Sequence, residues 1–289
     1  MAERKKVTVP DVQARKGVEK LTMVTAYDYP SASIADEAGV DMVLVGDSVA
    51  NAVHGLDTTL EMDVDVMALH TAAVARAKPR ALVVADMPWL SYHTSKSEAV
   101  LNAGRLVKAG AEAVKLEGGA KRIEVIRAIL DAEIPVMGHI GLTPQSVNAM
   151  GGFKVQGKES AQAYELIEDA VALVETGVFA LVLEGVPDLV AQAITSKVAV
   201  PTIGIGAGRG TDGQVLVFHD VLGLGGGHVP KFVRRYADLR SQAVDGLKRY
   251  VADVVSGAFP SEDETYHMKP EVAAGFTSED SSESVDSRS

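Results

Sequence analysis

Residues 81–119 read ALVVADMPWLSYHTSKSEAVLNAGRLVKAGAEAVKLEGG, and this stretch contains one complete repeat of the expected fold. It begins with an apolar run, Ala81–Ala85, continues through an amphipathic segment of helical length, Lys96–Ala109, and returns to an apolar run, Ala113–Leu116. Both runs are uniformly apolar rather than alternating, which is typical of parallel strands covered on both faces. The stretch therefore predicts a strand, a crossover helix and a second, parallel strand.

The same unit recurs along most of the chain. The predicted strands are Leu21–Ala26, Met42–Val45, Ala81–Ala85, Ala113–Leu116, Pro135–Ile140, Phe179–Leu183, Pro201–Ile205 and Val215–Phe218. The predicted crossover helices are Met62–Arg76, Lys96–Ala109, Ala120–Ala132, Ser160–Thr176 and Asp188–Ser196. Alternation of strands and helices that closes at eight strands predicts the α/β class, and within it a (β/α)8 TIM barrel rather than an open doubly wound sheet.

Further helices are expected at both ends of the barrel. Val9–Lys20 predicts an N-terminal helix that caps the bottom of the barrel, and Phe232–Val255 predicts a C-terminal helix that packs on it. In the seventh repeat, Gly206–Gly213 leaves room only for a short helix or a loop. We expect residues 1–260 to form a single catalytic domain, and the acidic, Ser-rich residues 261–289 to be a disordered tail.

Composition limits the possible partners and chemistry. The 289 residues contain 28 Lys+Arg against 39 Asp+Glu, a formal net charge of −11, which argues against binding to nucleic acid or to an anionic membrane. There is no cysteine, so a thiolate metal site and a Cys nucleophile are excluded. The charged start lacks an apolar signal region, and no continuous apolar span is long enough for a membrane helix. We therefore expect a cytoplasmic protein.

Acidic residues follow most of the predicted strands. They are Asp28, Asp47, Asp86, Glu117 and Glu184. In a barrel of this class the carboxyl ends of the strands meet at one mouth, where catalysis takes place. Any one of these residues could instead cap the following helix. Five together favour a site that holds a cation, and oxygen ligands without cysteine favour Mg²⁺ over zinc.

Two further side chains are expected at this mouth. Lys115 lies inside an apolar strand and shares a face with Glu117, two residues away, so its ammonium group would point at the metal site. A purely structural ion pair is the alternative for Lys115. His139, near the end of the fifth strand, is either a catalytic group or a core histidine with satisfied hydrogen bonds. No G-x-S-x-G motif is present, which argues against a serine hydrolase.

The chain closely resembles the ketopantoate hydroxymethyltransferase family between about residues 6 and 260. The motifs that carry the resemblance occur in the family's order: Thr25-Ala26-Tyr27-Asp28, Val45-Gly46-Asp47-Ser48, Val84-Ala85-Asp86-Met87-Pro88, Val114-Lys115-Leu116-Glu117-Gly118-Gly119, Gly138-His139-Ile140-Gly141-Leu142-Thr143-Pro144-Gln145, Gly151-Gly152-Phe153-Lys154-Val155-Gln156-Gly157 and Gly204-Ile205-Gly206-Ala207-Gly208. The resemblance implies a (β/α)8 barrel of the phosphoenolpyruvate mutase/isocitrate lyase superfamily.

The resemblance also implies a reaction. Members of the family transfer a hydroxymethyl group from 5,10-methylenetetrahydrofolate to 3-methyl-2-oxobutanoate through a Mg²⁺-stabilised enolate, which gives 2-dehydropantoate on the route to pantothenate. A homodecamer of cytoplasmic subunits, each with one Mg²⁺, is implied as well.

Site residues carry over by matching motif. Asp47 and Asp86 resemble the Mg²⁺ ligands, with Glu117 in or near the coordination shell. Ser48 and Lys115 resemble contacts of the keto acid, and Glu184 resembles the proton acceptor. Asp47 and Asp86 are expected to contact the substrate as well, and so is His139, from its place at a strand end beside the acidic mouth.

The nearest alternative is another Mg²⁺-dependent enzyme of the superfamily that forms an enolate from an α-keto acid, such as a lyase or a phosphonomutase. The lyases depend on a cysteine within a Lys-Lys-Cys-Gly-His segment, which this chain lacks. A barrel that has lost catalysis and serves as a binding protein is disfavoured because every matched site residue is present.

Overall fold

The structure is a computed structural model that describes residues 5–226, 229–273 and 276. The chain divides into two compact units, residues 1–238 and residues 239–289. The first unit contains all the strands, and the second contains helix α11 and the short segments that follow it.

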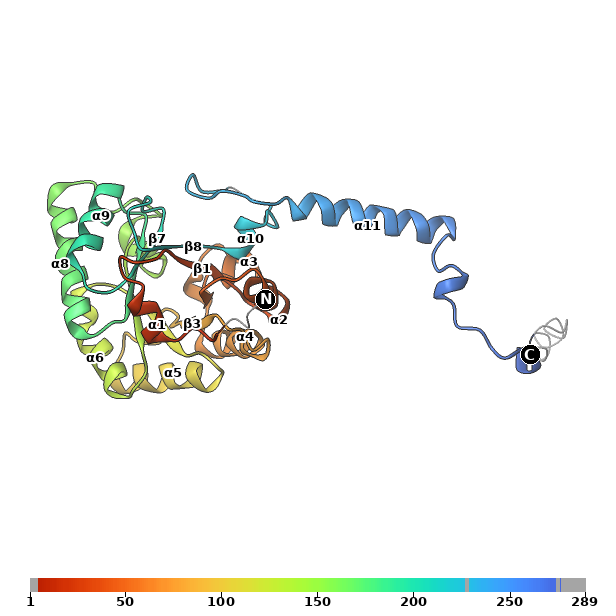
Figure 1. Cartoon of the computed structure of the whole chain (residues 1–289), viewed down its shortest axis with the longest axis horizontal. Helices are drawn as coiled ribbons and strands as arrows, with labels where there is room; N and C mark the ends of the chain where they lie inside the picture. The colour runs from red at the N-terminus through yellow and green to blue at the C-terminus, as the bar shows by residue number, and fades with distance from the viewer. Residues whose placement is uncertain (1–4, 227–228, 274–275, 277–289) are drawn as a thin grey trace, which may run out of the picture. The chain divides into compact units, whose positions relative to one another are not determined.

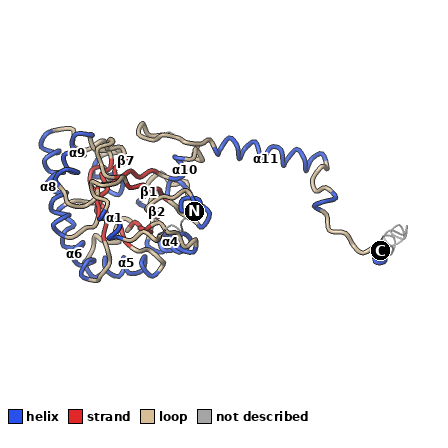
Figure 2. Tube along the Cα trace, in the orientation of Figure 1, coloured by secondary structure: helices blue, strands red, loops and turns tan. Residues whose placement is uncertain are grey.

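Eight parallel strands of the first unit form a closed barrel in sequence order, with β8 paired to β1. The strands are β1 (Leu21–Thr25), β2 (Met42–Val45), β3 (Leu82–Asp86), β4 (Ala113–Glu117), β5 (Val136–Gly141), β6 (Ala180–Glu184), β7 (Thr202–Ile205) and β8 (Gly213–Leu216). Figure 2 shows the strands in the middle of this unit and the helices around them. The predicted (β/α)8 barrel is confirmed.

Helices on the outside of the barrel connect successive strands from β1 to β7, and α10 follows β8 (Figure 1). They are α2 (Tyr29–Glu37), α3 (Val49–Ala52), α4 (Val64–Arg76), α5 (Lys96–Lys108), α6 (Ile123–Asp131), α7 (Val147–Met150), α8 (Ser160–Thr176), α9 (Asp188–Lys197) and α10 (Phe218–Val221), with 3₁₀ turns η1 (Thr59–Glu61), η2 (Ala120–Arg122) and η3 (Pro144–Ser146). Side-chain caps fix several starts: Asp28, Asp63 and Ser95 each accept a hydrogen bond from a backbone N–H in the first turn of α2, α4 and α5.

The barrel interior is a packed apolar core that the N-terminal segment closes. Helix α1 (Val9–Ala14) contributes Val12, which has no exposed surface and packs in one cluster with interior residues such as Leu21 and Met42. The predicted N-terminal capping helix is therefore present, although it ends six residues before the predicted Lys20. The interior side chains fill the barrel, so only its mouth can hold a substrate.

The structure corrects two predicted elements. The eighth strand is Gly213–Leu216 rather than Val215–Phe218, because Gly213 pairs with Leu21 and a side chain there would meet the Leu21 carbonyl oxygen at 2.5 Å. Sequence patterning discounts a strand that begins with glycine. Phe218 begins α10 instead.

The predicted C-terminal helix starts at Leu239 rather than Phe232, so residues 232–238 form a non-helical connection. In the seventh repeat no helix is found between β7 and β8, as the glycine-rich sequence indicated.

The second unit consists of α11 (Leu239–Ser256), η4 (Glu262–Glu264) and α12 (Pro270–Ala273). Among residues 261–273 and 276, all except Ala273 are exposed. The predicted disordered tail also includes residues 274–275 and 277–289, which lie outside the described residues. The boundary at residue 260 and the packing of the C-terminal helix on the barrel stay predictions. In the described parts of the chain, no helix combines the length and apolar character that a membrane crossing requires.

Barrel stability should depend on the interior layer. Leu82 of β3 is 1% exposed and belongs to the interior cluster. Its replacement by alanine leaves a cavity, so we expect Leu82→Ala to lower the free energy of unfolding by about 2–5 kcal/mol, measured by urea denaturation. Leu101→Ala, at a position 69% exposed on α5, is the matched control and should change the value by less than about 0.5 kcal/mol. Equal effects of the two substitutions would contradict the packed interior.

Candidate active site

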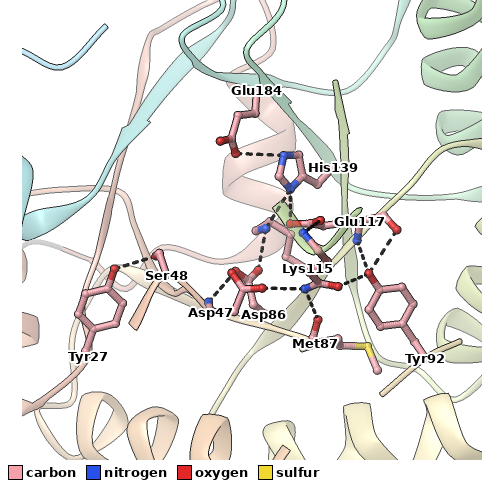
Figure 3. A network of polar contacts seen from close by, with 11 residues as sticks. Tyr27, Asp47, Ser48, Asp86, Met87, Tyr92, Lys115, Glu117, His139 and Glu184 are labelled. Atoms are coloured by element: carbon pink, nitrogen blue, oxygen red, sulfur yellow. Dashed lines mark hydrogen bonds and ion pairs between the residues drawn. The ribbon is translucent and has the colours of Figure 1, made fainter. Parts of the chain in front are cut away.

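The parallel register of four neighbouring strands brings the predicted residues to the barrel mouth. It pairs Asp86 with Lys115, Glu117 with His139, and Gly141 with Glu184. Because each of these residues stands at or near the carboxyl end of its strand, the side chains converge on one point (Figure 3).

All the predicted site residues line one cavity of about 250 Å³. They are Asp47, Ser48, Asp86, Lys115, Glu117, His139 and Glu184. Apolar side chains, among them Leu44, Val182 and Phe232, line the same cavity. A cavity of this kind, with a few converging polar groups in an apolar wall, is typical of a small-molecule site.

Asp47 and Asp86 are buried side by side. The backbone N–H of Asp47 donates to Asp86 Oδ2 at 3.0 Å, so the loop after β2 is tied to the end of β3. Burial, followed by the charges of Asp86 and Glu117, raises the pKa of Asp47 to about 8. Burial also raises the pKa of Asp86, although the Lys115 ammonium group opposes that rise. The chain therefore stabilises negative charge on these two carboxyls only in part.

Lys115 lies between the acidic groups. Its Nζ is 2.8 Å from Asp86 Oδ1 and 3.2 Å from His139 Nδ1. Burial alone would lower the pKa of Lys115, but the carboxylates of Asp86, Glu117 and Asp47 raise it above the ordinary value. The side chain is therefore a buried, permanently charged cation. The ion pair considered as the structural alternative exists, and its partner is Asp86.

His139 links two carboxylates from neighbouring strands. Its Nδ1 is 3.4 Å from Glu117 Oε1, and its Nε2 is 3.3 Å from Glu184 Oε2. Burial and the Lys115 charge lower the pKa of His139, but contacts with Glu117 and Glu184 outweigh them and raise it to about 9. The imidazole therefore lies between the two carboxylates, with its Nε2 atom facing Glu184. His139 and Lys115 in turn lower the pKa of Glu117 against the effect of burial.

Gln145 connects two of the candidate metal ligands, Asp47 and Glu117. Its role could not be predicted from the sequence. Its Nε2 donates to Asp47 Oδ2 at 2.8 Å and to the Met87 carbonyl at 3.0 Å, and its backbone N–H donates to Glu117 Oε2 at 3.0 Å. The hydroxyl of Tyr92 donates to Gln145 Oε1 at 2.6 Å and accepts from the Glu117 N–H at 3.2 Å. One residue of the loop after β5 therefore fixes two carboxylates on other strands.

Ser48 faces the cavity instead of capping the helix that it precedes. It makes no capping hydrogen bond to α3, and its Oγ lies 2.8 Å from the hydroxyl of Tyr27. Asp28 is the acidic strand-end residue for which the capping interpretation is correct, because its Oδ1 accepts from the Ser31 N–H at 2.8 Å. The other four acidic strand-end residues are cavity residues and cap no helix.

The donor set fits a magnesium ion better than a transition metal. Within the described residues, no three His, Asp or Glu side chains lie close enough together to form a complete metal site. Mg²⁺ does not require one, because it binds through one or two carboxylates and takes its other ligands from water and substrate. Asp47, with a pKa of about 8, would hold a proton at pH 7 unless a cation takes its place. The buried carboxylates therefore have the chemistry of a hard-cation site.

Comparisons with known proteins agree with this geometry. A family model described as ketopantoate hydroxymethyltransferase matches residues 6–262. The 3-methyl-2-oxobutanoate hydroxymethyltransferase of Syntrophomonas wolfei is 55% identical over 259 residues, which cover 89% of this chain and 94% of that relative.

Solved structures with a similar fold include 2,3-dimethylmalate lyase, a PEP mutase/isocitrate lyase superfamily member, with a TM-score of 0.57 at 15% identity over 92% of this chain and 93% of that chain. Phosphonopyruvate hydrolase in complex with oxalate and Mg²⁺ has a TM-score of 0.57 at 14% identity over 89% of this chain and 93% of that chain. At such identities the likeness shows the fold alone.

Removal of the Gln145 side-chain amide should lower the stability of the protein measurably. Gln145→Leu keeps the side-chain size but leaves Asp47 Oδ2, the Met87 carbonyl and the Tyr92 hydroxyl without this partner. We expect the free energy of unfolding to fall by about 1–3 kcal/mol, measured in urea without added metal. Gln192→Leu, on the exposed face of α9, is the control and should change the value by less than about 0.5 kcal/mol. A loss no larger than that of the control would show that the bridge carries no stability.

Proposed function

The chain belongs to the ketopantoate hydroxymethyltransferase family, and from this premise we propose how its residues carry out the reaction. The family and its relatives at about 55% identity establish hydroxymethyl transfer to 3-methyl-2-oxobutanoate. A lyase or phosphonomutase function is disfavoured, because those proteins share the fold at only about 15% identity. The observation that carries the residue assignments is the convergence of acidic side chains and Lys115 on one cavity.

The reaction needs a donor at the oxidation level of formaldehyde, and we propose 5,10-methylenetetrahydrofolate, with 2-dehydropantoate as the product. The family resemblance supports this donor. We propose that the subunits assemble as a homodecamer in the cytoplasm, as the resemblance also implies.

We propose that Asp47 and Asp86 hold one Mg²⁺ per subunit, with Glu117 in or near its coordination shell. Support comes from the incompletely compensated charge of the buried carboxyls. When bound, the ion supplies Lewis-acid stabilisation of negative charge on the oxygens of the keto acid. Gln145 and the Asp47 N–H bond keep the two ligand carboxylates in fixed orientations before any ligand arrives.

Lys115 and Ser48 are proposed to bind the keto acid. The Lys115 ammonium group is held by Asp86 and lines the cavity, where a fixed, buried positive charge acts strongly on a developing oxyanion. The Ser48 hydroxyl, positioned by Tyr27, offers a hydrogen bond on the other side of the cavity. Together they orient the substrate so that its C3 carbon faces Glu184.

Glu184 is proposed as the base that removes the C3 proton. Its side chain is 18% exposed, lines the cavity and lies 3.3 Å from His139 Nε2, which orients the carboxylate. The C3–H bond breaks, the proton moves to a Glu184 oxygen, and the electron pair at C3 forms the new bond to the methylene carbon of the donor. The carbon–nitrogen bonds of that methylene break, their electron pairs stay on the tetrahydrofolate nitrogens, and water supplies the hydroxyl oxygen of the product and the protons that the nitrogens take up. His139 is a positioning residue in this scheme, because it acts through Glu184.

Removal of the base separates binding from proton transfer. We expect Glu184→Gln to abolish exchange of the C3 proton of 3-methyl-2-oxobutanoate with D₂O, followed by proton NMR, by a factor of at least about 10². Binding of the keto acid in the presence of Mg²⁺ should remain, since the amide keeps the shape of the side chain. Glu175→Gln, on the exposed surface of α8, should exchange normally. Normal exchange in Glu184→Gln would remove this residue from the role.

Removal of a ligand charge tests the metal assignment. We expect Asp47→Asn to weaken Mg²⁺-dependent binding of the keto acid at least about tenfold, measured by calorimetry, because a neutral amide is a poor ligand for a hard cation. Asp57→Asn, in an exposed position of the following loop, is the matched control and should bind as the unmodified protein does. Equal affinity in both variants would overturn the assignment of Asp47.

A further inference from the structure

A second cavity of about 240 Å³ lies beside the catalytic one. The residues that line it include Gly118, Gly119, Thr143, Gln156, Glu165 and Asp169. At the end of β4, Glu117 lines the first cavity and Gly118, the next residue, lines the second. None of the residue roles proposed above uses this second space.

The connection between β5 and α8 runs between the two cavities. Pro144 lines the catalytic cavity, whereas its neighbour Thr143 lines the second one. Two backbone hydrogen bonds hold this segment against the end of β6: Leu142 N–H donates to the Glu184 carbonyl at 2.7 Å, and Gln156 N–H donates to the Gly185 carbonyl at 2.9 Å. A ligand in the second cavity would therefore lie close to the strand that carries the proposed base.

Polar groups with unused hydrogen-bonding capacity line the second cavity. Thr143 is only 5% exposed, and its hydroxyl has no hydrogen-bond partner among the described residues. Glu165 lies one helical turn from Asp169 on α8 and forms no ion pair with any described residue. Asp169 uses one oxygen to accept from the Ala120 N–H at 2.7 Å, which leaves the other oxygen available.

Glycines allow the cavity walls to come this close together. A side chain at Gly119 would overlap the Asp169 carboxylate, because its Cβ would lie 1.9 Å from Asp169 Cγ. The glycine-rich stretch of residues 151–157, one of the motifs that carry the family resemblance, contributes Gln156 and Gly157 to the wall.

The charge of these groups indicates the class of ligand. Two carboxylates repel an anionic keto acid, but they accept hydrogen bonds well from a neutral molecule with adjacent N–H groups. We propose that the second cavity binds the flat nitrogen heterocycle of the one-carbon donor, an inference that rests on the proposed function. Glu165 accepts hydrogen bonds from the amino and ring N–H groups, and Gln156 and Thr143 contact the other edge. Lys121, at the same cavity, lies where it can meet a carboxylate of the donor's tail.

Steady-state kinetics with varied 5,10-methylenetetrahydrofolate, at saturating keto acid and Mg²⁺, tests this assignment. Glu165→Gln should raise KM for the donor about threefold to tenfold, because one charge-assisted hydrogen bond is lost at a side chain that is exposed in the unliganded protein. The exchange of the C3 proton with D₂O, measured without donor, should keep its rate, since that step takes place in the first cavity. Glu168→Gln, on the same helix but outside the cavity wall, is the matched control and should leave KM unchanged.

The possible outcomes distinguish a failure of the donor subsite from a failure of the proposed function. An unchanged donor KM in Glu165→Gln, with normal proton exchange, would overturn the donor subsite and leave the proposed function intact. Absence of metal-dependent exchange in the unmodified protein would overturn the proposed function itself. If Glu165→Gln does not fold, Thr143→Val, which removes only the unpartnered hydroxyl, tests the same subsite and should likewise raise donor KM.

Discussion

The burial of several carboxylates at one point is the constraint on which the site depends. Desolvation of each charge costs several kcal/mol, and like charges raise that cost further. The strand register offsets this desolvation cost locally, because Asp86 stands opposite Lys115 and Glu117 stands opposite His139. A lysine inside an apolar strand is tolerated here because its partner lies on the adjacent strand. The compensation is incomplete at Asp47, and that deficit supports the proposed cation site.

The strand-end residues could be predicted from sequence because the barrel fold fixes where they go. Once uniformly apolar runs alternate with helical segments, the residue that ends each run must lie at the mouth. Asp86, Glu117 and Glu184 follow from this rule alone. The two-residue spacing of Lys115 and Glu117 places both on the interior face, and both are buried there. Asp28 shows the limit of the rule, since a carboxylate after a strand also satisfies the N–H groups of the next helix.

The loops and their contacts could not be predicted in the same way. Gln145 binds Asp47 across 98 residues of sequence, and no periodicity connects the two positions. Its place soon after the fifth strand, next to Pro144, was the available signal, but polar residues are common in such loops. Phe232 was placed in a helix because its neighbours have helical spacing, yet it lines the catalytic cavity from a non-helical connection. The start of β8 was missed because Gly213 has low strand propensity and is needed for its small size.

Different parts of the fold hold the polar groups of the two cavities. The groups proposed to contact the keto acid stand at strand ends or, for Ser48, shortly after one, where ladder hydrogen bonds restrict their positions as proton transfer requires. Groups of the second cavity stand on α8 and on the segment that follows β5. That segment also carries Gln145, two residues after Thr143, so the orientation of Asp47 and the shape of the second cavity depend on the same short stretch of backbone. Its hydrogen bonds to the carbonyls of Glu184 and Gly185 complete the connection, because they fix the segment to the strand that carries the base. A single loop therefore sets the relative positions of the proposed metal ligand, the proposed base and the cavity assigned to the donor.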